Sequence, residues 1–364
     1  MSVAVPPLPD PLRGWELERR GAFAEAEASY RRAAAEGPDC ARARVLLGLL
    51  LVSRGEYEQG WRFFESRETG PRPGNWHGEA LEGRDITVTA EDDGLGDHIQ
   101  FARWLPLLKV RGAGRVLYAP AAPLARLFRS IPGIEITEPR TLSPEELFAA
   151  IDRIEAGAPD LSVRSGSLPH IFDARPESIP PAPYLSAAPA DIEQWRGRLP
   201  DAPLRVGLVW RGSPTHAIDV WRSLPSLRTL APLWEVPGVA FVSLQKGAGE
   251  DEARAGIPGQ PITHLGGEIQ DFADTAAILE HLDLTISVDT STAHAAGALG
   301  KPVWVLSPQV PDWRWRNADM VRRWYPTARV FPQHRHHDWS GAVQDVAAAL
   351  REFKRAREGA KEGL

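Results

Sequence analysis

The chain has 364 residues, 43% of them hydrophobic and 25% charged, and its net charge of −6 gives no reason to expect nucleic acid or an acidic membrane surface as the main partner. This length predicts two or three folded domains, and the single cysteine, Cys40, excludes a disulfide framework or a structural metal site built on cysteines. A secretory leader and an apolar run of about 18 residues are both missing, so we expect a cytoplasmic protein without an integral membrane segment.

The chain begins with two segments, within residues 1–72, that align at an offset of 34 residues. Leu17 aligns with Leu51, and Gly21 aligns with Gly55. A helix, a turn with Gly and a second helix at this period resemble the tetratricopeptide repeat. About two units are fewer than such a repeat usually needs to stand alone, so we expect this segment to pack against the domain that follows. An incidental pair of amphipathic helices is the alternative.

Short apolar strands then alternate with helical segments in two stretches, residues 84–185 and 186–338, and a final helix occupies 339–364. The predicted strands, in chain order, are "ITVTA", "RVLYA", "IEIT", "RVGLVW", "VAFVSL", "LTISV" and "PVWVL". The Pro-rich residues 176–203 indicate a linker with one short helix, and Pro106 should kink or split the helix that contains it. The alternation predicts an α/β protein with two Rossmann-like, doubly wound domains that face a ligand cleft at their strand ends.

A polar segment follows one of these strands in the stretch "DLTISVDTSTAHAAGALGKPVWVL", residues 283–306. Asp289 is the first residue after the strand, and Thr290 suits the cap of the next helix. His294 then falls in the first helical turn and points back toward the sheet end, where ligands of parallel sheets bind. Free N–H groups at a helix start favour an anion such as a diphosphate. Alternatively, Asp289 and Thr290 are only caps and His294 is a packed or surface side chain.

This stretch resembles the donor-binding segment of the heptosyltransferase-like glycosyltransferases (glycosyltransferase family 9-like), inverting and metal-independent enzymes that include ADP-heptose lipopolysaccharide heptosyltransferases. The resemblance implies the GT-B fold and contacts from Asp289, Thr290 and His294 to a nucleotide diphosphate. Ser291, which we include in the donor site, stands where the family usually has Gly. Further stretches resemble the branch of the family that carries tetratricopeptide repeats at the front: "DDGLGDHIQFARWLPLL", "VGLVWRGSP", "FVSLQKG", "DFADTAAIL" and "PDWRWRNADMVRRWYP".

The stretch "DDGLGDH" holds the residue that we predict for catalysis. Inverting glycosyl transfer needs a base that removes a proton from the acceptor hydroxyl while the nucleotide diphosphate leaves from the other face of the sugar. By resemblance, Asp97 occupies the general-base position, and Gly94 and Gly96 let the loop turn tightly and leave space for substrate. His98 and Gln100 are near enough in sequence to contact the acceptor or the sugar. The alternative is that Asp97 merely caps a helix that begins at His98.

The stretch "WRGSPTHAIDVWRS" follows the first strand of the second domain. We include Arg211 in the donor site, and we expect Gly212, Ser213 and nearby backbone amides to hold phosphate oxygens. Relatives in this branch commonly carry a Lys where this chain has Ala217, so an ammonium that would balance the leaving diphosphate is missing. Arg222 keeps its place and could supply that charge through two hydrogen bonds.

The remaining predictions concern the second half of the chain. Lys246 is another candidate for charge balance, and Gln245 could bond the nucleoside. Most of the tryptophans near the C-terminus should pack the loop that carries them rather than stack on a base or sugar; these are Trp313, Trp315 and Trp324. A histidine cluster lacks the spacing of a zinc site and should lie in a solvated loop; its members are His334, His336 and His337.

Together these features predict a bacterial glycosyltransferase that moves a sugar from a nucleotide-diphosphate donor to a hydroxyl of a glycan, lipid or protein, with heptose implied by the resemblance. No metal or other cofactor is expected. The helical repeats suggest a docking surface for a protein partner or for self-association. One alternative is a catalytically degenerate scaffold whose repeats bind a protein, which Ala217 and Ser291 favour. Another is a sugar-nucleotide epimerase with the same fold.

Overall fold

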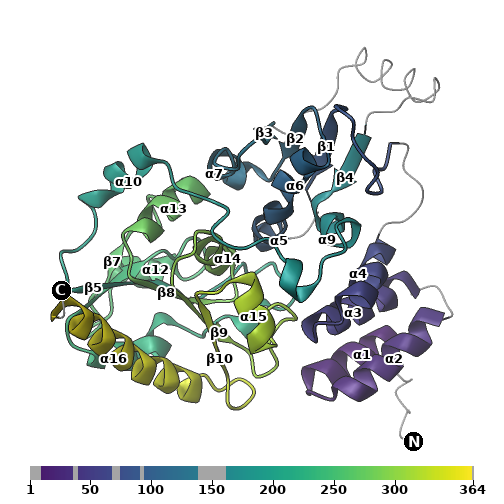
Figure 1. The fold of residues 1–364 in the computed structure, drawn as a ribbon. Coiled ribbons are helices and arrows are strands. Elements are labelled where there is room, and N and C mark those ends of the chain that lie inside the picture. The colour runs from purple at the N-terminus through teal and green to yellow at the C-terminus, as the bar shows by residue number, and fades with distance from the viewer. Residues whose placement is uncertain (1–9, 36–39, 68–73, 91–93, 138–160, 363–364) are drawn as a thin grey trace, which may run out of the picture.

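The computed structural model describes residues 10–35, 40–67, 74–90, 94–137 and 161–362. Within them the chain forms a helical segment (10–67), a first lobe (74–185) and a second lobe (186–362), arranged as Figure 1 shows. Parts of the sequence predictions lie outside the described residues: 1–9, 36–39 and 68–72 of the repeat region, the two aspartates that open "DDGLGDH", and 138–160 of the first predicted domain.

Four helices, followed by the 3-10 turn η1 (Glu65–Arg67), form the helical segment: α1 (Asp10–Arg19), α2 (Phe23–Ala35), α3 (Cys40–Ser53) and α4 (Tyr57–Phe64). Gly21 and Gly55 occupy equivalent turns, between α1 and α2 and between α3 and α4, with φ angles of 75° and 85°. Glycine adopts this left-handed conformation without strain, so each helix pair can turn back sharply. The buried side chains of Tyr57, Trp61 and Phe64 belong to the main core of the molecule. The helical segment therefore packs against the rest of the chain, as predicted.

The first lobe is built on a four-stranded parallel sheet in the order β3-β2-β1-β4. Its strands are β1 (Ile86–Thr89), β2 (Val116–Ala119), β3 (Glu135–Ile136) and β4 (Leu161–Arg164). Sequence analysis missed β4, because "LSVR" at a half-buried sheet edge carries only two apolar residues. The helices are α5 (Leu95–Phe101), α6 (Leu105–Val110), α7 (Ala125–Phe128) and α9 (Leu168–Ile171), with 3-10 turns η2 (Ala102–Trp104), η3 (Ala122–Leu124), η4 (Ser165–Ser167) and η5 (Pro176–Ser178). Pro106 lies in the first turn of α6, which confirms that it splits the helix pattern.

The second lobe is built on a six-stranded parallel sheet in the order β10-β9-β8-β5-β6-β7. Its strands are β5 (Leu204–Val209), β6 (Val239–Ser243), β7 (Thr263–His264), β8 (Leu284–Val288), β9 (Val303–Ser307) and β10 (Ala328–Pro332). The predictions missed β7 and β10, which form the two sheet edges. The five residues of central β8 are all buried, as expected for a strand covered on both faces.

Helices cover both faces of this second sheet: α10 (Pro189–Arg196), α11 (Asp219–Arg222), η6 (Leu227–Glu235), α12 (Glu250–Ala255), α13 (Phe272–Glu280), α14 (Ser291–Ala298), α15 (Ala318–Trp324) and α16 (Ser340–Glu362). The C-terminal helix α16 buries Val343, Val346 and Leu350 in the core of the second lobe. Neither α16 nor any other helix in the described ranges has the length and apolar character to cross a membrane.

Ion pairs join the two lobes at Arg126 of α7. Its guanidinium pairs with Asp191 of α10 at 3.1 Å, and with Asp271 and Asp274 at 2.8 and 2.6 Å. Asp271 is the N-cap of α13 and accepts hydrogen bonds from the first backbone amides of that helix. One arginine of the first lobe therefore fixes the start of a helix in the second lobe.

A second arginine, Arg103, is buried where the lobes meet, with 2% of its surface exposed. It donates hydrogen bonds to the carbonyl oxygens of Gln100 (3.1 Å), Pro180 (3.2 Å) and Trp324 (3.0 Å), and to the hydroxyl of Tyr184 (3.3 Å). Gln100, Pro180 and Tyr184 belong to the first lobe, and Trp324 belongs to α15 of the second lobe. The guanidinium therefore supplies the hydrogen bonds that three buried stretches of backbone need.

Replacing Arg103 with Ala should destabilise the fold, because it leaves buried carbonyl oxygens without donors. We expect the free energy of unfolding to fall by about 2 to 4 kcal/mol, measured by urea denaturation. The matched control is Arg13→Ala, which removes an exposed arginine of α1 and should change the value by less than about 0.5 kcal/mol. Equal effects of the two variants would contradict the role given to Arg103.

Candidate active site

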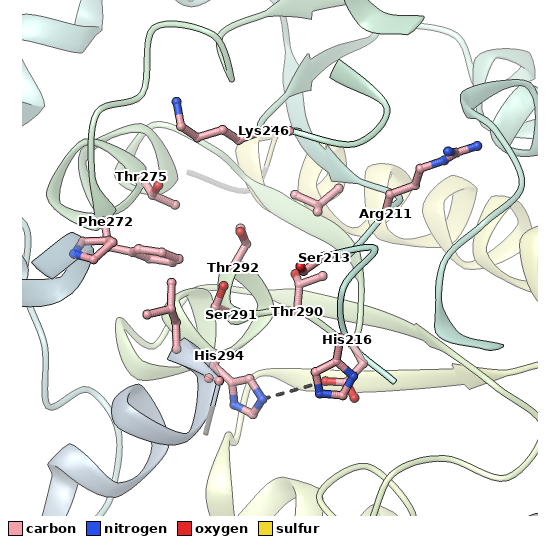
Figure 2. A pocket seen from close by; sticks show the side chains of 18 of the residues that line it. Arg211, Ser213, His216, Lys246, Phe272, Thr275, Thr290, Ser291, Thr292 and His294 are labelled. Carbon is pink, nitrogen blue, oxygen red and sulfur yellow. Dashed lines mark ion pairs between the residues drawn. The ribbon is translucent and has the colours of Figure 1, made fainter. Parts of the chain in front are cut away.

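The carboxyl end of β8 leads directly into α14, as the strand and helix patterns predict. Asp289 follows the strand, and Thr290 has the extended conformation of an N-cap residue. Its hydroxyl does not cap the helix, however, but contacts the Ser287 hydroxyl at 2.9 Å. Figure 2 shows the hydroxyl groups of Ser213, Thr290, Ser291 and Thr292 gathered near the middle of one pocket. The helix start therefore offers hydroxyl and amide groups to a bound anion.

The first lobe approaches α14 closely at Gly96. A Cβ atom at this position would lie 2.8 Å from Cδ2 of His294, closer than real Cβ contacts. Gly94 is the N-cap of α5, and Asp97 lies in the first turn of that helix. The helix therefore begins before Asp97, and the alternative in which Asp97 caps a helix starting at His98 is wrong. Glycine at position 96 is what allows the two helix starts to face each other.

Arg314 connects the two lobes beside this contact. Its guanidinium forms an ion pair with Asp97 and donates hydrogen bonds to Oε1 of Gln100 (2.7 Å) and Oδ1 of Asp312 (2.8 Å). Burial alone would raise the pKa of Asp312, but the charge and hydrogen bonds of Arg314 hold it below its ordinary value. The carboxylates on either side raise the pKa of Arg314, so this residue is a permanent cation in the site.

Asp289 and His294 form a buried pair with unusual protonation. Oδ1 of Asp289 accepts a hydrogen bond from the indole of Trp315 at 2.7 Å and lies 3.9 Å from Nε2 of His294. Burial, together with the charge of Asp312, raises the pKa of Asp289 to about 6. Burial, together with the charge of Arg314, lowers the pKa of His294 to about 3. His294 is therefore neutral at physiological pH and acts as a hydrogen-bonding group rather than as a cation.

Gln245 lines the pocket, but its amide has backbone partners at both ends. Its Oε1 accepts hydrogen bonds from the backbone amides of Trp210 (2.9 Å) and Arg211 (3.0 Å), and its Nε2 donates to the carbonyls of Arg211 (3.0 Å) and Ala248 (2.8 Å). The side chain is 1% exposed. Because both ends of the amide are occupied, Gln245 holds two loops together instead of bonding a nucleoside.

The other predicted donor residues line the pocket but differ in whether their polar groups already have a partner in the protein. The guanidinium of Arg211 bonds the carbonyl of Pro225 and points away from the hydroxyl groups in Figure 2. The amide of Gly212 donates to Ser223, so it is already occupied. Arg222 lines the pocket, 3.3 Å from Asp219.

Lys246 also lines the pocket. Its ammonium group donates a hydrogen bond to the carbonyl of Ile269 at 2.6 Å. Since an ammonium group carries three donors, this bond leaves Lys246 capable of meeting an anion as well. Lys246 and Arg222 are therefore the predicted cations that remain placed for a diphosphate.

His98 and Gln100 were predicted on the acceptor or sugar side, and the structure places both elsewhere. His98 is 3% exposed and its Nδ1 accepts from the amide of Ala121, whereas Gln100 is fully buried and supports Arg314. Neither is among the described residues that line the pocket. Their positions follow from α5, which turns His98 toward Ala121 and Gln100 toward Arg314, away from the pocket lining.

The aromatic and histidine predictions concern packing and metal binding. All three C-terminal tryptophans are buried, with exposures of 5%, 2% and 2% for Trp313, Trp315 and Trp324. They pack in the protein interior, as predicted for most of them, Trp313 and Trp315 from the 311–316 stretch and Trp324 from the end of α15. In the part of the chain that the structure describes, no group of three or more His, Cys, Asp or Glu side chains could hold a metal ion.

The pocket between the lobes has a volume of about 760 Å³, which is within the usual range for small-molecule sites. The first lobe contributes Gly94, Leu95, Gly96, Asp97 and Pro123. Sequence analysis missed several second-lobe residues that line it: His216, Asp271, Phe272, Thr275, Asp312 and Arg314. The signal for Arg314 was present in "PDWRWRN", where arginine and tryptophan alternate, but only the tryptophans were considered.

Comparisons with known proteins bear on the fold. No protein family model matches the chain. The protein FlbA of Caulobacter vibrioides is 30% identical over 363 residues, which cover 92% of this chain and 59% of FlbA, so the chain spans less than two thirds of that relative.

Two solved structures have a similar fold. ADP-heptose lipopolysaccharide heptosyltransferase II of Escherichia coli has a TM-score of 0.54 and 13% identity, over 75% of this chain and 99% of that chain. A family 9 glycosyl transferase from Veillonella parvula has a TM-score of 0.55 and 14% identity, over 77% and 100%. At these identities the likeness shows the fold: an α/β architecture with parallel sheets that matches GT-B glycosyltransferases.

Asp289→Asn should stabilise the fold at neutral pH. The folded-state pKa of about 6 lies above the ordinary 3.8, so ionising Asp289 in the folded chain costs at most about 3 kcal/mol above pH 6 and nothing below pH 3.8. Asparagine keeps an oxygen for Trp315 and carries no charge. The gain in unfolding free energy should therefore be near zero at pH 4 and largest at pH 7, as measured by urea denaturation at both values.

The comparison must be made between variant and wild type. The lowered pKa of His294 makes wild-type stability rise with pH over the same range, which opposes the effect of Asp289. Asp319→Asn, an exposed carboxylate of α15, is the matched control and should show no such trend. An equal gain at pH 4 and pH 7 would contradict desolvation of Asp289 as the cause.

Proposed function

We propose that the chain is an inverting, metal-independent glycosyltransferase that moves a sugar from a nucleotide-diphosphate donor to a hydroxyl group. One observation carries this proposal: Asp97 of the first lobe and the start of α14 in the second lobe line the same pocket. A carboxylate on one side and an anion-binding helix start on the other are the two groups that this reaction needs.

In this mechanism the acceptor oxygen attacks the anomeric carbon of the sugar. As that bond forms, the bond from the anomeric carbon to the diphosphate oxygen breaks, and the acceptor proton moves to the carboxylate of Asp97. The ion pair with Arg314 stabilises the ionised form of Asp97, so proton transfer becomes favourable only as the acceptor oxygen gives an electron pair to the new bond and its proton becomes more acidic. Arg314 also orients the carboxylate toward the cleft.

The donor's diphosphate would lie at the start of α14. Amides and hydroxyl groups of Thr290 and Ser291 meet its oxygens, and Arg222 and Lys246 balance its charge. His294 supplies a neutral hydrogen-bonding group beside Asp289. No metal is required in this scheme, because protein cations and helix amides stabilise the leaving group.

Several finer features belong to the same proposal. The similar E. coli structure is named for ADP-heptose, which makes a heptose the first sugar to test. The repeated turns at Gly21 and Gly55 support a tetratricopeptide-like reading of the helical segment. Such repeats offer a surface for a protein acceptor, a protein partner or self-association. The other acceptors that we propose are a glycan and a lipid. We propose that the reaction takes place in the cytoplasm.

The alternative is a scaffold with the same fold and no activity. Ala217 and Ser291 favour it, and so does the ion pair on Asp97, which weakens that carboxylate as a base. Calorimetric titration with ADP, GDP, UDP and their sugars separates the two functions. The glycosyltransferase should prefer one nucleotide, whereas a scaffold should bind none of them.

Asp97→Asn tests the general base. The amide keeps an oxygen for Arg314 but cannot take up the proton, so transfer should fall by at least about 100-fold. Nucleotide affinity should stay within about threefold, because the diphosphate contacts lie in the second lobe. The readouts are a transfer assay by mass spectrometry and calorimetry, with Asp319→Asn as the control. Full turnover by the Asn variant would remove Asp97 from the mechanism.

Ala217→Lys tests the missing cation. Ala217 lies between His216 and Ile218, which both line the pocket, so a lysine there can approach the diphosphate. One added charge near a partly exposed diphosphate should tighten ADP binding by roughly 3- to 10-fold at low salt and by less at 0.5 M salt. The control is Ala217→Gln, which has similar bulk without charge. An unchanged affinity with the lysine would place Ala217 away from the phosphates.

A further inference from the structure

The site's central cation sits in an irregular loop, residues 311–316, between β9 and α15. Turns and bends, without helix or strand hydrogen bonds, make up this 311–316 loop. Arg314 nevertheless makes contacts with Asp97, Gln100 and Asp312 that require a fixed position. What holds the loop must therefore come from the elements that pack against it.

One support is an ion pair between Arg316 and the helical segment. The guanidinium of Arg316 donates to the carbonyl of Pro311 at 3.2 Å and to Oε1 of Glu18 in α1 at 2.6 Å. The two side chains are only 13% and 15% exposed, so the pair is poorly screened. The hydroxyl of Tyr30 in α2 donates to the second oxygen of Glu18 at 2.8 Å. Arg316 thereby joins both ends of the loop to each other and to two helices of the helical segment.

The second support is aromatic. The ring of Trp313 lies edge-to-face against Trp61 of α4, with 6.0 Å between centroids, and also against Trp324. The indole of Trp324 donates to the hydroxyl of Tyr57 at 2.8 Å. On this platform the guanidinium carbon of Arg314 lies 4.2 Å from the centre of the Trp313 ring. Every aromatic ring in the set is at least 95% buried.

Residues of the loop therefore face two different parts of the molecule. Trp313 and Arg316 face the helical segment, whereas Arg314 faces the cleft. We propose that the helical segment is a structural part of the active site, which positions Arg314 through Glu18 and Trp61. The expected effect on catalysis rests on the proposed function. The expected effect on the position of the 311–316 loop does not. Glu18 and Trp61 are positioning residues, since neither lines the pocket between the lobes.

The test uses the full chain with Glu18→Ala, the conservative Glu18→Gln, and Glu27→Ala as the matched control. Glu27 pairs with Arg31 and Arg54 in the same helical segment, and neither of these ion pairs involves a residue of the 311–316 loop. Hydrogen exchange followed by mass spectrometry should show at least about tenfold faster exchange over residues 311–316 in Glu18→Ala. Glu18→Gln keeps an acceptor oxygen for Arg316, and its amide can donate to the hydroxyl oxygen of Tyr30, so it should recover most of the protection. Glu27→Ala should match wild type.

A kinetic readout separates positioning from general stability. Glu18→Ala should lower kcat by roughly 10- to 100-fold through misplacement of Arg314, with nucleotide affinity within about threefold. In an Arg314→Ala background the same substitution should change kcat by less than about twofold, because the group being positioned is gone. Glu18→Gln should restore most of kcat.

The outcomes distinguish this inference from the proposed function. Unchanged exchange over 311–316 in Glu18→Ala would overturn the inference, and so would faster exchange with unchanged kcat or an additive effect with Arg314→Ala. A wild-type chain that transfers no sugar would overturn the proposed function, and the exchange data would then decide the inference by themselves. If Glu18→Ala fails to fold, Trp61→Phe carries the comparison, because it shrinks the ring against which Trp313 packs. A loss of loop protection smaller than twofold with this variant would equally overturn the inference.

Discussion

The largely buried cation of Arg314 is the constraint on which the geometry of the pocket depends. A guanidinium removed from water needs partners for its charge and its donors, and here these come from both lobes: Asp97 and Gln100 from the first, Asp312 from the second. The lobes must therefore approach to hydrogen-bonding distance at this point. The space that remains beside the contact is the pocket, with a carboxylate on one wall and a helix start on the other.

The position of Arg314 also depends on the helical segment, because the loop that carries Arg314 has no regular structure of its own. Arg316 and Trp313 anchor the loop to α1 and α4, and the main core runs without a break from α4 through the first lobe to one face of the second sheet. The same burial that fixes Arg314 also sets the protonation of its neighbours, so that Asp289 holds a proton more tightly than His294 near pH 5. In this region the packing that positions the side chains therefore also sets their protonation.

Residues that directly follow a strand were predicted well from the sequence. Asp289 and Thr290 come after β8, and Asp97 lies on the helix after β1, so each lies at the carboxyl edge of its own sheet, as local pattern predicts. Because β1 and β8 belong to different sheets, the meeting of these residues in one pocket depends on how the two lobes face each other. Side-chain direction was not predictable in the same way. Gln245 and Gln100 have the amide chemistry of ligand contacts, yet each is occupied by neighbours from distant parts of the chain.

The sequence by itself determined the order of elements: paired helices with Gly turns, two sets of alternating strands and helices, and the break at Pro106. These depend on periodicity, turn chemistry and backbone restrictions, which act over a few residues. Only the tertiary structure decided that Arg314 meets Asp97, 217 positions away in the chain, and that Glu18 contacts Arg316 of the loop that carries Arg314. Contacts of that kind depend on how finished elements pack, and a local pattern carries no information about the partner that a buried charge will find.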